Sequence, residues 1–166
     1  MNLTYREGTK NDLEGLKALG ILSYGQFKDD LSEKNWNKMD SILRLDENYL
    51  KLLDISTCFI CLDGEQLVGM AYLVHNGNPT DIFQADWSYI RMVGVNPNYA
   101  GQGIGKKLTQ MCIDLAKKTD EKIIALHTSE FMHAARHIYE SLGFEIVKEI
   151  EPLFEKKYWL YHLNIN

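Results

Sequence analysis

Apolar residues follow two different periods along this chain, and each change of period marks a new element. Residues 57–62 and 66–74 are apolar runs typical of strands, and Asp63-Gly64 between them favours a hairpin because both residues tolerate positive φ. Leucines recur at helical spacing after Thr9, which is followed by Asp12 in an arrangement typical of a helix start. With a strand over Asn2–Arg6 and a second helical region over Ser32–Leu53, broken near Asp46, the first half predicts a strand, two helices and a hairpin.

The second half of the chain predicts an alternation of strands and helices. The apolar strand Ile90–Val95 should stop at Asn96-Pro97, because proline cannot donate to a ladder and restricts the residue before it. A helix with one apolar face follows, then further elements at Lys122–His127 (strand), Phe131–Leu142 (helix), Phe144–Ile150 and Lys157–Ile165 (closing strands joined at Glu151-Pro152). This order predicts a single α/β domain over residues 1–166, with helices layered on a mixed sheet.

Three glycines, Gly101, Gly103 and Gly105, stand between the central strand and its helix. The first turn of a helix carries unpaired N–H groups and about half a positive charge, and glycines let an anion approach that backbone closely. The spacing does not match a P-loop, because Lys107 follows Gly105-Lys106 where serine or threonine belongs. It does not match a dinucleotide fingerprint either, because Lys106 occupies a glycine position. The segment therefore predicts a diphosphate site of another kind.

The segment Ala100-Gly101-Gln102-Gly103-Ile104-Gly105 resembles the pyrophosphate loop of the GNAT superfamily of N-acetyltransferases, R/Q-x-x-G-x-G/A. The resemblance continues through Leu126–Phe144, where a strand and a helix bearing Tyr139 precede Gly143-Phe144, so that it covers roughly the C-terminal half of the chain. Two positions depart from the family pattern. Ala100 replaces the usual Arg or Gln, and Met132 stands where an asparagine is common.

The resemblance implies a mixed, mostly antiparallel central sheet flanked by helices, with acetyl-CoA as cosubstrate and no metal. The diphosphate would lie on the backbone amides of the glycine loop, and the pantetheine arm would bond to the central strand like an added strand. Gly94 would leave room for that arm, although a β-bulge would explain this glycine equally well. The expected cofactor-binding residues are Val93, Gly94, Val95, Ala100, Gly101, Gln102, Gly103, Ile104, Gly105 and Lys106.

Tyr139 is the expected catalytic residue, placed to hydrogen-bond the departing thiolate. The general base is left open among Asp86, Glu130 and His127, because the central strand carries no carboxylate. No residue is placed as an acyl-enzyme nucleophile, so we expect direct attack by an amine in a ternary complex. The alternatives are a non-catalytic acyl-CoA-binding or sensing module and an enzyme that uses a longer acyl chain.

Composition narrows the class of protein. The net charge of -5 argues against nonspecific nucleic-acid binding, and no apolar run reaches membrane-spanning length. Cys58 and Cys61 fall in one strand, where residues three apart point to opposite faces and cannot share a zinc ion. An odd cysteine count and an N-terminus without a signal-like apolar core predict a reducing, cytoplasmic setting.

The acceptor is expected to be a primary amine of a small molecule or a peptide. In the family that this chain resembles, the region between the first two strands shapes the acceptor pocket, and Tyr24, Phe27 and Trp36 are the candidates there. The acidic balance mildly favours a cationic acceptor, although net charge says little about a pocket. The strand Lys157–Leu163 is apolar on both faces, so it is expected either to pair across a homodimer or to close the core.

Overall fold

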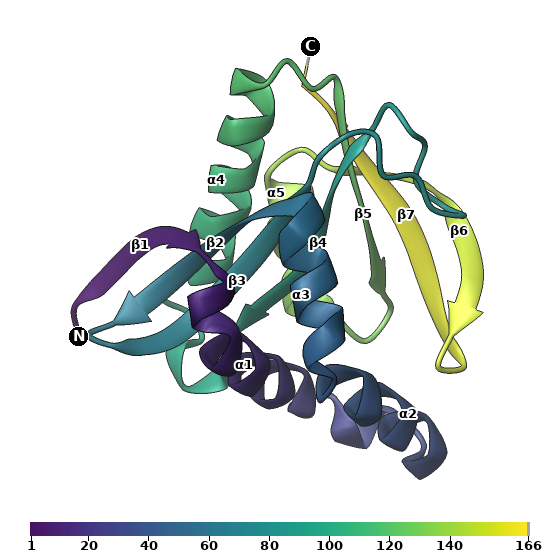
Figure 1. The fold of residues 1–166 in the computed structure, drawn as a ribbon. Helices are drawn as coiled ribbons and strands as arrows, with labels where there is room; N and C mark the ends of the chain where they lie inside the picture. The colour runs from purple at the N-terminus through teal and green to yellow at the C-terminus, as the bar shows by residue number, and fades with distance from the viewer. Residues whose placement is uncertain (166) are drawn as a thin grey trace.

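The structure is a computed structural model that describes residues 1–165, and it contains a seven-stranded sheet with helices on both faces (Figure 1). The sheet runs in the order β1-β2-β3-β4-β5-β7-β6, and every neighbouring pair is antiparallel except β4 and β5. The mixed, mostly antiparallel sheet predicted from the sequence is confirmed. The strands are β1 (Leu3–Gly8), β2 (Ser56–Asp63), β3 (Gln66–Val74), β4 (Ser88–Val95), β5 (Ile123–Ser129), β6 (Glu145–Leu153) and β7 (Lys156–Asn164).

Five α-helices and three short 3-10 segments complete the described part of the chain. The helices are α1 (Leu13–Gly25), α2 (Glu33–Leu43), α3 (Asp46–Ile55), α4 (Ile104–Lys118) and α5 (His133–Ser141). None of them, within residues 1–165, has the length and apolar character needed to cross a membrane.

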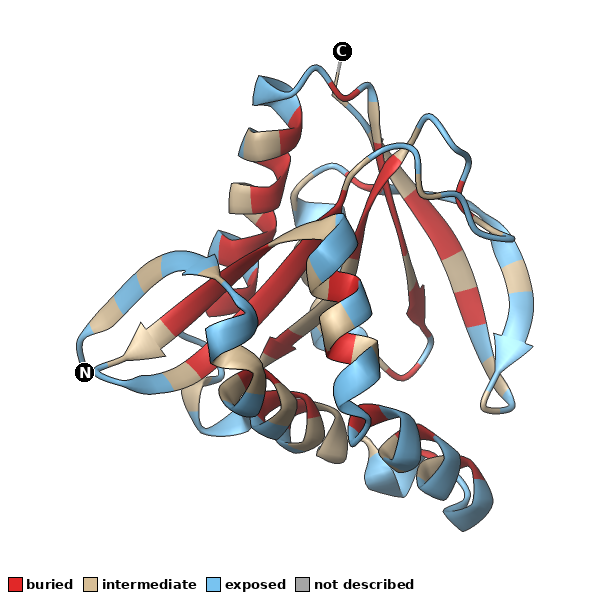
Figure 2. Cartoon of the chain, in the orientation of Figure 1, coloured by how far each residue is buried: buried red, intermediate tan, exposed pale blue. Residues whose placement is uncertain are grey.

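Two apolar cores lie on opposite faces of the sheet, and β3, whose residues are almost all buried, contributes to both (Figure 2). On one face α4 and α5 pack over the sheet, with Leu108 and Ile104 almost fully buried. On the other face α1 and α3 pack over it, with Leu16 at the centre. Cys61 belongs to the first core and Cys58 to the second, as their positions on one strand predicted.

Local sequence explains several element boundaries. Thr9 forms the expected capping box, in which its hydroxyl accepts from Asn11 and its N–H donates to the Asp12 carboxylate at 2.8 Å. The break expected near Asp46 separates α2 from α3, and Gly64 makes the β2–β3 turn with a φ of 60°. These predictions are confirmed.

The turn between the last two strands is not at Glu151-Pro152, and that prediction is wrong. The strands are joined by Phe154-Glu155, which have positive φ angles of 55° and 61°. Pro152 instead lies inside β6, at an irregularity in the pairing with β7. The proline is tolerated because β6 is an edge strand, where a missing ladder donor is least costly.

The aromatic strand β7 lies between β5 and β6 and is hydrogen-bonded on both edges. Its alternation is the predicted one, since Trp159 and Tyr161 belong to the core under α4 and α5 while Tyr158 and Leu160 face the other side. Packing within one chain therefore accounts for its apolar faces. The reason for expecting this strand at a homodimer interface is thereby removed.

Candidate active site

The central strands β4 and β5 separate soon after they begin. Their parallel pairing is limited to two positions, Ser88 opposite Ile124 and Tyr89 opposite Ala125. Farther along, β4 bends at a bulge, because the register with β3 shifts between Met70 and Tyr72 and Met92 adopts a φ of 49°. The strands diverge beyond this point (Figure 1). Unpaired backbone on the inner edges of two strands is thus exposed to the space between them.

A cavity of about 760 Å³ includes the space between β4 and β5 and continues beyond it in two directions. One end is formed by the glycine loop before α4, and the other by α1, α2 and the β6–β7 turn. Its charged lining residues are Lys38, Arg91 and Lys106, and among residues 1–165 it has no aspartate or glutamate in its lining. The lining of the cavity is therefore positively charged, although the net charge of the protein is -5.

The glycine loop is built for close approach by an anion. Gly101 and Gly103 have φ angles of 80° and 76°, in the region that residues with a Cβ rarely adopt. The first bond of the helix runs from the Lys107 amide to the Gly103 carbonyl at 3.0 Å. Within the described residues, the six amides of 101–106 have no hydrogen-bond acceptor, and the first turn of α4 contains no carboxylate. Free donors, helix dipole and Lys106 all favour a diphosphate here.

Most of the residues predicted to bind the cofactor line this cavity. Gly94 and Gln102 do not line it. A Cβ on Gly94 would meet the Ser23 side chain of α1 at 3.2 Å, and the Val95 amide donates to the Ser23 hydroxyl at 3.2 Å. Close approach of α1 to the sheet therefore explains the glycine at 94, whereas the bulge lies earlier, at Met92. The predicted residues that line the cavity are Val93, Val95, Ala100, Gly101, Gly103, Ile104, Gly105 and Lys106.

Tyr139 reaches the cavity from α5. Its ring is buried against Phe144, with 5.9 Å between ring centroids, in an edge-to-face arrangement. Its hydroxyl has no hydrogen-bond partner among the described residues, so it is free for a ligand. Burial raises the pKa of this phenol above its ordinary value, and the group therefore stays protonated as a donor at neutral pH.

Of the three candidate bases, only His127 lines the cavity. The Glu130 carboxylate accepts from the Lys157 amide at 2.9 Å, outside the cavity. His127 lies between the rings of Phe83 and Tyr158, and its Nδ1 is buried without a partner among the described residues. Burial and the nearby Arg91 lower the pKa of His127 to about 4, so the imidazole is neutral at pH 7.

Aromatic side chains form the end of the cavity away from the glycine loop. Tyr24 and Phe27 line it as expected, whereas Trp36 does not. Phe27 contacts Phe131 with centroids 5.2 Å apart, and Phe131 contacts Tyr158 at 6.4 Å.

Three residues of this end were not singled out from the sequence. Arg91 is the single charged residue in β4, and this was a usable signal. Phe154 comes from the β6–β7 turn, and Lys38 lies over its ring at 5.8 Å. Phe154 was missed because the sequence placed that turn wrongly.

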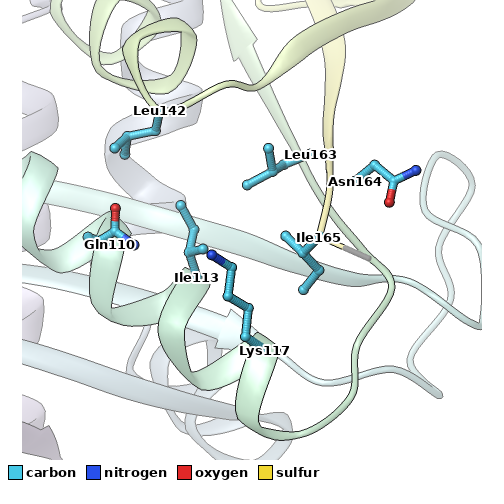
Figure 3. A pocket seen from close by; sticks show the side chains of 7 residues that line it. All are labelled: Gln110, Ile113, Lys117, Leu142, Leu163, Asn164 and Ile165. Atoms are coloured by element: carbon cyan, nitrogen blue, oxygen red, sulfur yellow. The ribbon is translucent and has the colours of Figure 1, made fainter.

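A second, smaller hollow of about 280 Å³ lies between α4 and the end of β7 (Figure 3). Lys117 and Gln110 line it from the helix and Leu163 from the strand. It shares no lining residue with the larger cavity. The described residues also contain no group of three or more His, Cys, Asp or Glu side chains able to hold a metal ion.

Comparison with known proteins gives the family of this fold. The model of the Acetyltransferase (GNAT) family matches residues 25–144. N-alpha-acetyltransferase 30 of Schizosaccharomyces pombe is 35% identical over 89 residues, which cover 52% of this chain and 55% of that protein. The match thus spans about half the length of this curated relative.

Two solved structures share the fold across nearly the whole chain. The PaiA N-acetyltransferase of Thermoplasma acidophilum in complex with coenzyme A has a TM-score of 0.80 at 16% identity, covering 99% of both chains. A chain of the NatC complex bound to Gag peptide and CoA has a TM-score of 0.73 at 22% identity, covering 100% of both. Since the family model covers most of the chain, this protein belongs to the acetyltransferase (GNAT) family.

Proposed function

We propose that this protein is an acetyl-CoA-dependent N-acetyltransferase that acetylates a primary amine of a small molecule or a peptide. The observation that carries the proposal is the continuity of one cavity, from the free amides of the glycine loop, past Tyr139, to an aromatic pocket. A binding module needs only the first of these parts. An enzyme needs all three in one space.

The residues at the glycine loop fit the anionic end of acetyl-CoA. The amides of 101–106 supply donors for a diphosphate, and Lys106 supplies a cation. The split between β4 and β5 exposes backbone beside Val93, where an extended arm can add like a strand. When bound, acetyl-CoA supplies an acetyl group activated as a thioester. The relatives and solved structures named above support this donor, since two of those structures contain coenzyme A.

The reaction that this geometry favours is direct attack by the acceptor nitrogen on the acetyl carbon, with formation of a C–N bond and cleavage of the C–S bond. The Tyr139 hydroxyl, which has no protein partner, donates a hydrogen bond to the departing sulfur. The proton lost by the nitrogen passes to solvent. His127 is the one of the three candidate bases that lines the cavity, and its pKa of about 4 makes it a weak base. Cys58, Cys61 and Cys112 are buried and line no part of the cavity, so none of them is placed to form an acyl-cysteine intermediate.

A peptide α-amine is the acceptor class that the relatives favour. The Schizosaccharomyces pombe protein is named N-alpha-acetyltransferase 30, and the NatC complex was crystallised with a peptide. The end of the cavity that would receive such a peptide is lined by Lys38 of α2 and Phe154 of the β6–β7 turn.

The proposal is tested with purified protein, acetyl-CoA and a panel of peptide and small-molecule amines, by following the release of free CoA with a thiol reagent. An enzyme releases CoA faster with at least one amine than with buffer alone, and the acetylated product appears in the mass spectrum. Saturable binding of acetyl-CoA without turnover on any amine would instead support the non-catalytic acyl-CoA-binding module.

A further inference from the structure

Arg91 is the unusual residue of the cavity. It stands in the middle of β4, the strand SYIRMVGV, whose other side chains are apolar or uncharged, and it is half-buried. Across the strand pair it lies opposite Tyr72 of β3, a fully buried residue. The side-chain nitrogens of Arg91 are not among the fully buried polar atoms, so the guanidinium is accessible to a ligand in the cavity.

No group of the protein neutralises this cation. Among residues 1–165, the guanidinium of Arg91 takes part in no ion pair and no hydrogen bond, and no carboxylate lines the cavity that it faces. Its electrostatic neighbours are the uncharged rings of Tyr24, Tyr89 and His127. The other three arginines, by contrast, form ion pairs and lie outside the cavity. Arg44, for example, pairs with Asp40 at 2.9 Å.

Acetyl-CoA cannot supply the missing anion. All phosphates of coenzyme A lie at the end of the molecule opposite the thioester, and the glycine loop holds that end. Arg91 and Val95 are four residues apart, which is about 13 Å in a regular strand and somewhat less across the bulge at Met92, and the loop begins beyond Val95. An arginine side chain spans only part of that distance. An anion that pairs with Arg91 would therefore come with the second substrate.

We infer that the acceptor carries a carboxylate close to its amine, and that Arg91 binds this carboxylate in the aromatic end of the cavity. This inference rests on the proposed acetyl transfer and names the class of acceptor. Arginine suits the role because its planar fork donates two parallel hydrogen bonds to a carboxylate. Tyr24 and Phe27 form the wall of the same end of the cavity and hold the apolar part of the acceptor.

Arg91 also acts on the acceptor's amine. A fixed positive charge in the cavity disfavours the ammonium form, which cannot attack a thioester, and favours the neutral amine. In an acceptor with a carboxylate, the attraction between Arg91 and the carboxylate outweighs this repulsion at closer range. An acceptor without a carboxylate lacks this attraction to Arg91. The cavity thus selects against the cationic amines that the net charge of the protein would suggest.

The carboxylate can be the α-carboxylate of an amino acid or the side-chain carboxylate of the first residue of a peptide. Matched pairs of acceptors distinguish the two. Free amino acids compared with their amides test an α-carboxylate, and peptides that begin with Glu compared with Gln test a side-chain carboxylate. We expect kcat/KM about 10- to 100-fold higher for the acid than for the amide in one of the two series, as for a hydrogen bond to a charged group.

The variants Arg91→Gln and Arg91→Lys assign this preference to the residue. Arg91→Gln should abolish the preference for the acid, and Arg91→Lys should retain a part of it, because a lysine keeps the charge and loses the fork. The KM for acetyl-CoA should stay unchanged in both, and a thermal shift with acetyl-CoA shows that each variant is folded. Arg44→Gln, an exposed and ion-paired arginine, is the matched control that should keep the full preference.

Equal kcat/KM for acid and amide in both series would overturn the inference while leaving acetyl transfer intact. A preference that persists in Arg91→Gln, or a loss that is equal for acids and amides, would overturn it as well. No turnover of any amine by a protein that binds acetyl-CoA would overturn the proposed function together with this inference.

Discussion

Replacement of Tyr139 by phenylalanine separates catalysis from binding in this cavity. The change removes a hydroxyl that has no protein partner and keeps the ring that packs against Phe144. Because no protein hydrogen bond is lost, the free energy of unfolding should change by less than about 1 kcal/mol. The diphosphate site lies on a different element, so the Kd for acetyl-CoA should stay nearly the same.

The effect on kcat follows from the acidities of the two groups. A free thiol has a pKa of about 8.5 and tyrosine about 10, so complete proton transfer to the thiolate is uphill by about 2 kcal/mol. Burial raises the pKa of Tyr139 and makes complete transfer still less favourable. The phenol therefore contributes a hydrogen bond to a developing charge, worth about 1.5–3 kcal/mol, which is about 10- to 100-fold in kcat.

The assay is steady-state release of CoA by the wild type and Tyr139→Phe, with calorimetry of acetyl-CoA binding to both. Tyr89→Phe is the matched control, since its hydroxyl donates to the Asn78 carbonyl at 2.8 Å outside the cavity. The control should lose some stability and keep its kcat. Equal kcat for the wild type and Tyr139→Phe would refute the role of this hydroxyl.

Three further predictions concern the loop, the hairpin and the histidine. Gly103→Ala places a Cβ at a φ of 76°, which costs about 1–2 kcal/mol of backbone strain. Calorimetry should therefore show weaker binding of acetyl-CoA to this variant. An unchanged affinity would contradict the role of the loop. Glu155→Gly relieves a φ of 61° in the β6–β7 turn and should stabilise the protein against urea by about 1 kcal/mol, whereas destabilisation would show that this turn conformation is wrong. The pKa of His127 is about 4 in the folded protein against an ordinary 6.5, so the unfolded chain binds this proton more readily and stability falls as pH drops from 6.5 toward 4. His127→Gln should have a shallower pH dependence of unfolding in that range, and an unaltered slope would exclude this contribution.

The sequence predicted the parts of this protein whose cause is local. The capping box at Thr9, the end of β4 before Pro97 and the glycines before α4 are each dictated by neighbouring residues, and the structure contains all three. The turn at Phe154-Glu155 was missed because neither residue ordinarily favours positive φ and Pro152 provided a stronger turn signal. Tertiary position overrode local preference there.

The cavity itself could be predicted only in part. Its glycine loop and Tyr139 lie in contiguous motifs, so both could be found from the sequence. The end of the cavity away from the glycine loop brings together α1, α2, β4 and the β6–β7 turn, which are far apart in the chain, and no local pattern reveals that Arg91 and Tyr24 line it together. Net charge predicted a preference for cationic acceptors, but the lining of the cavity has the opposite sign. The net charge sums over the whole protein and does not give the charge inside an enclosed site.

The most direct test of the account is a thermal-shift titration with acetyl-CoA, with free CoA and ATP as controls and calorimetry in parallel. A ligand at about a hundred times its Kd adds about 2.7 kcal/mol to the free energy of unfolding, which raises the melting midpoint visibly. We expect a saturable shift with acetyl-CoA and CoA, little with ATP, and a smaller shift for Gly103→Ala at the same concentration. The absence of both a shift and a binding heat with acetyl-CoA would show that the amides before α4 do not hold this cosubstrate.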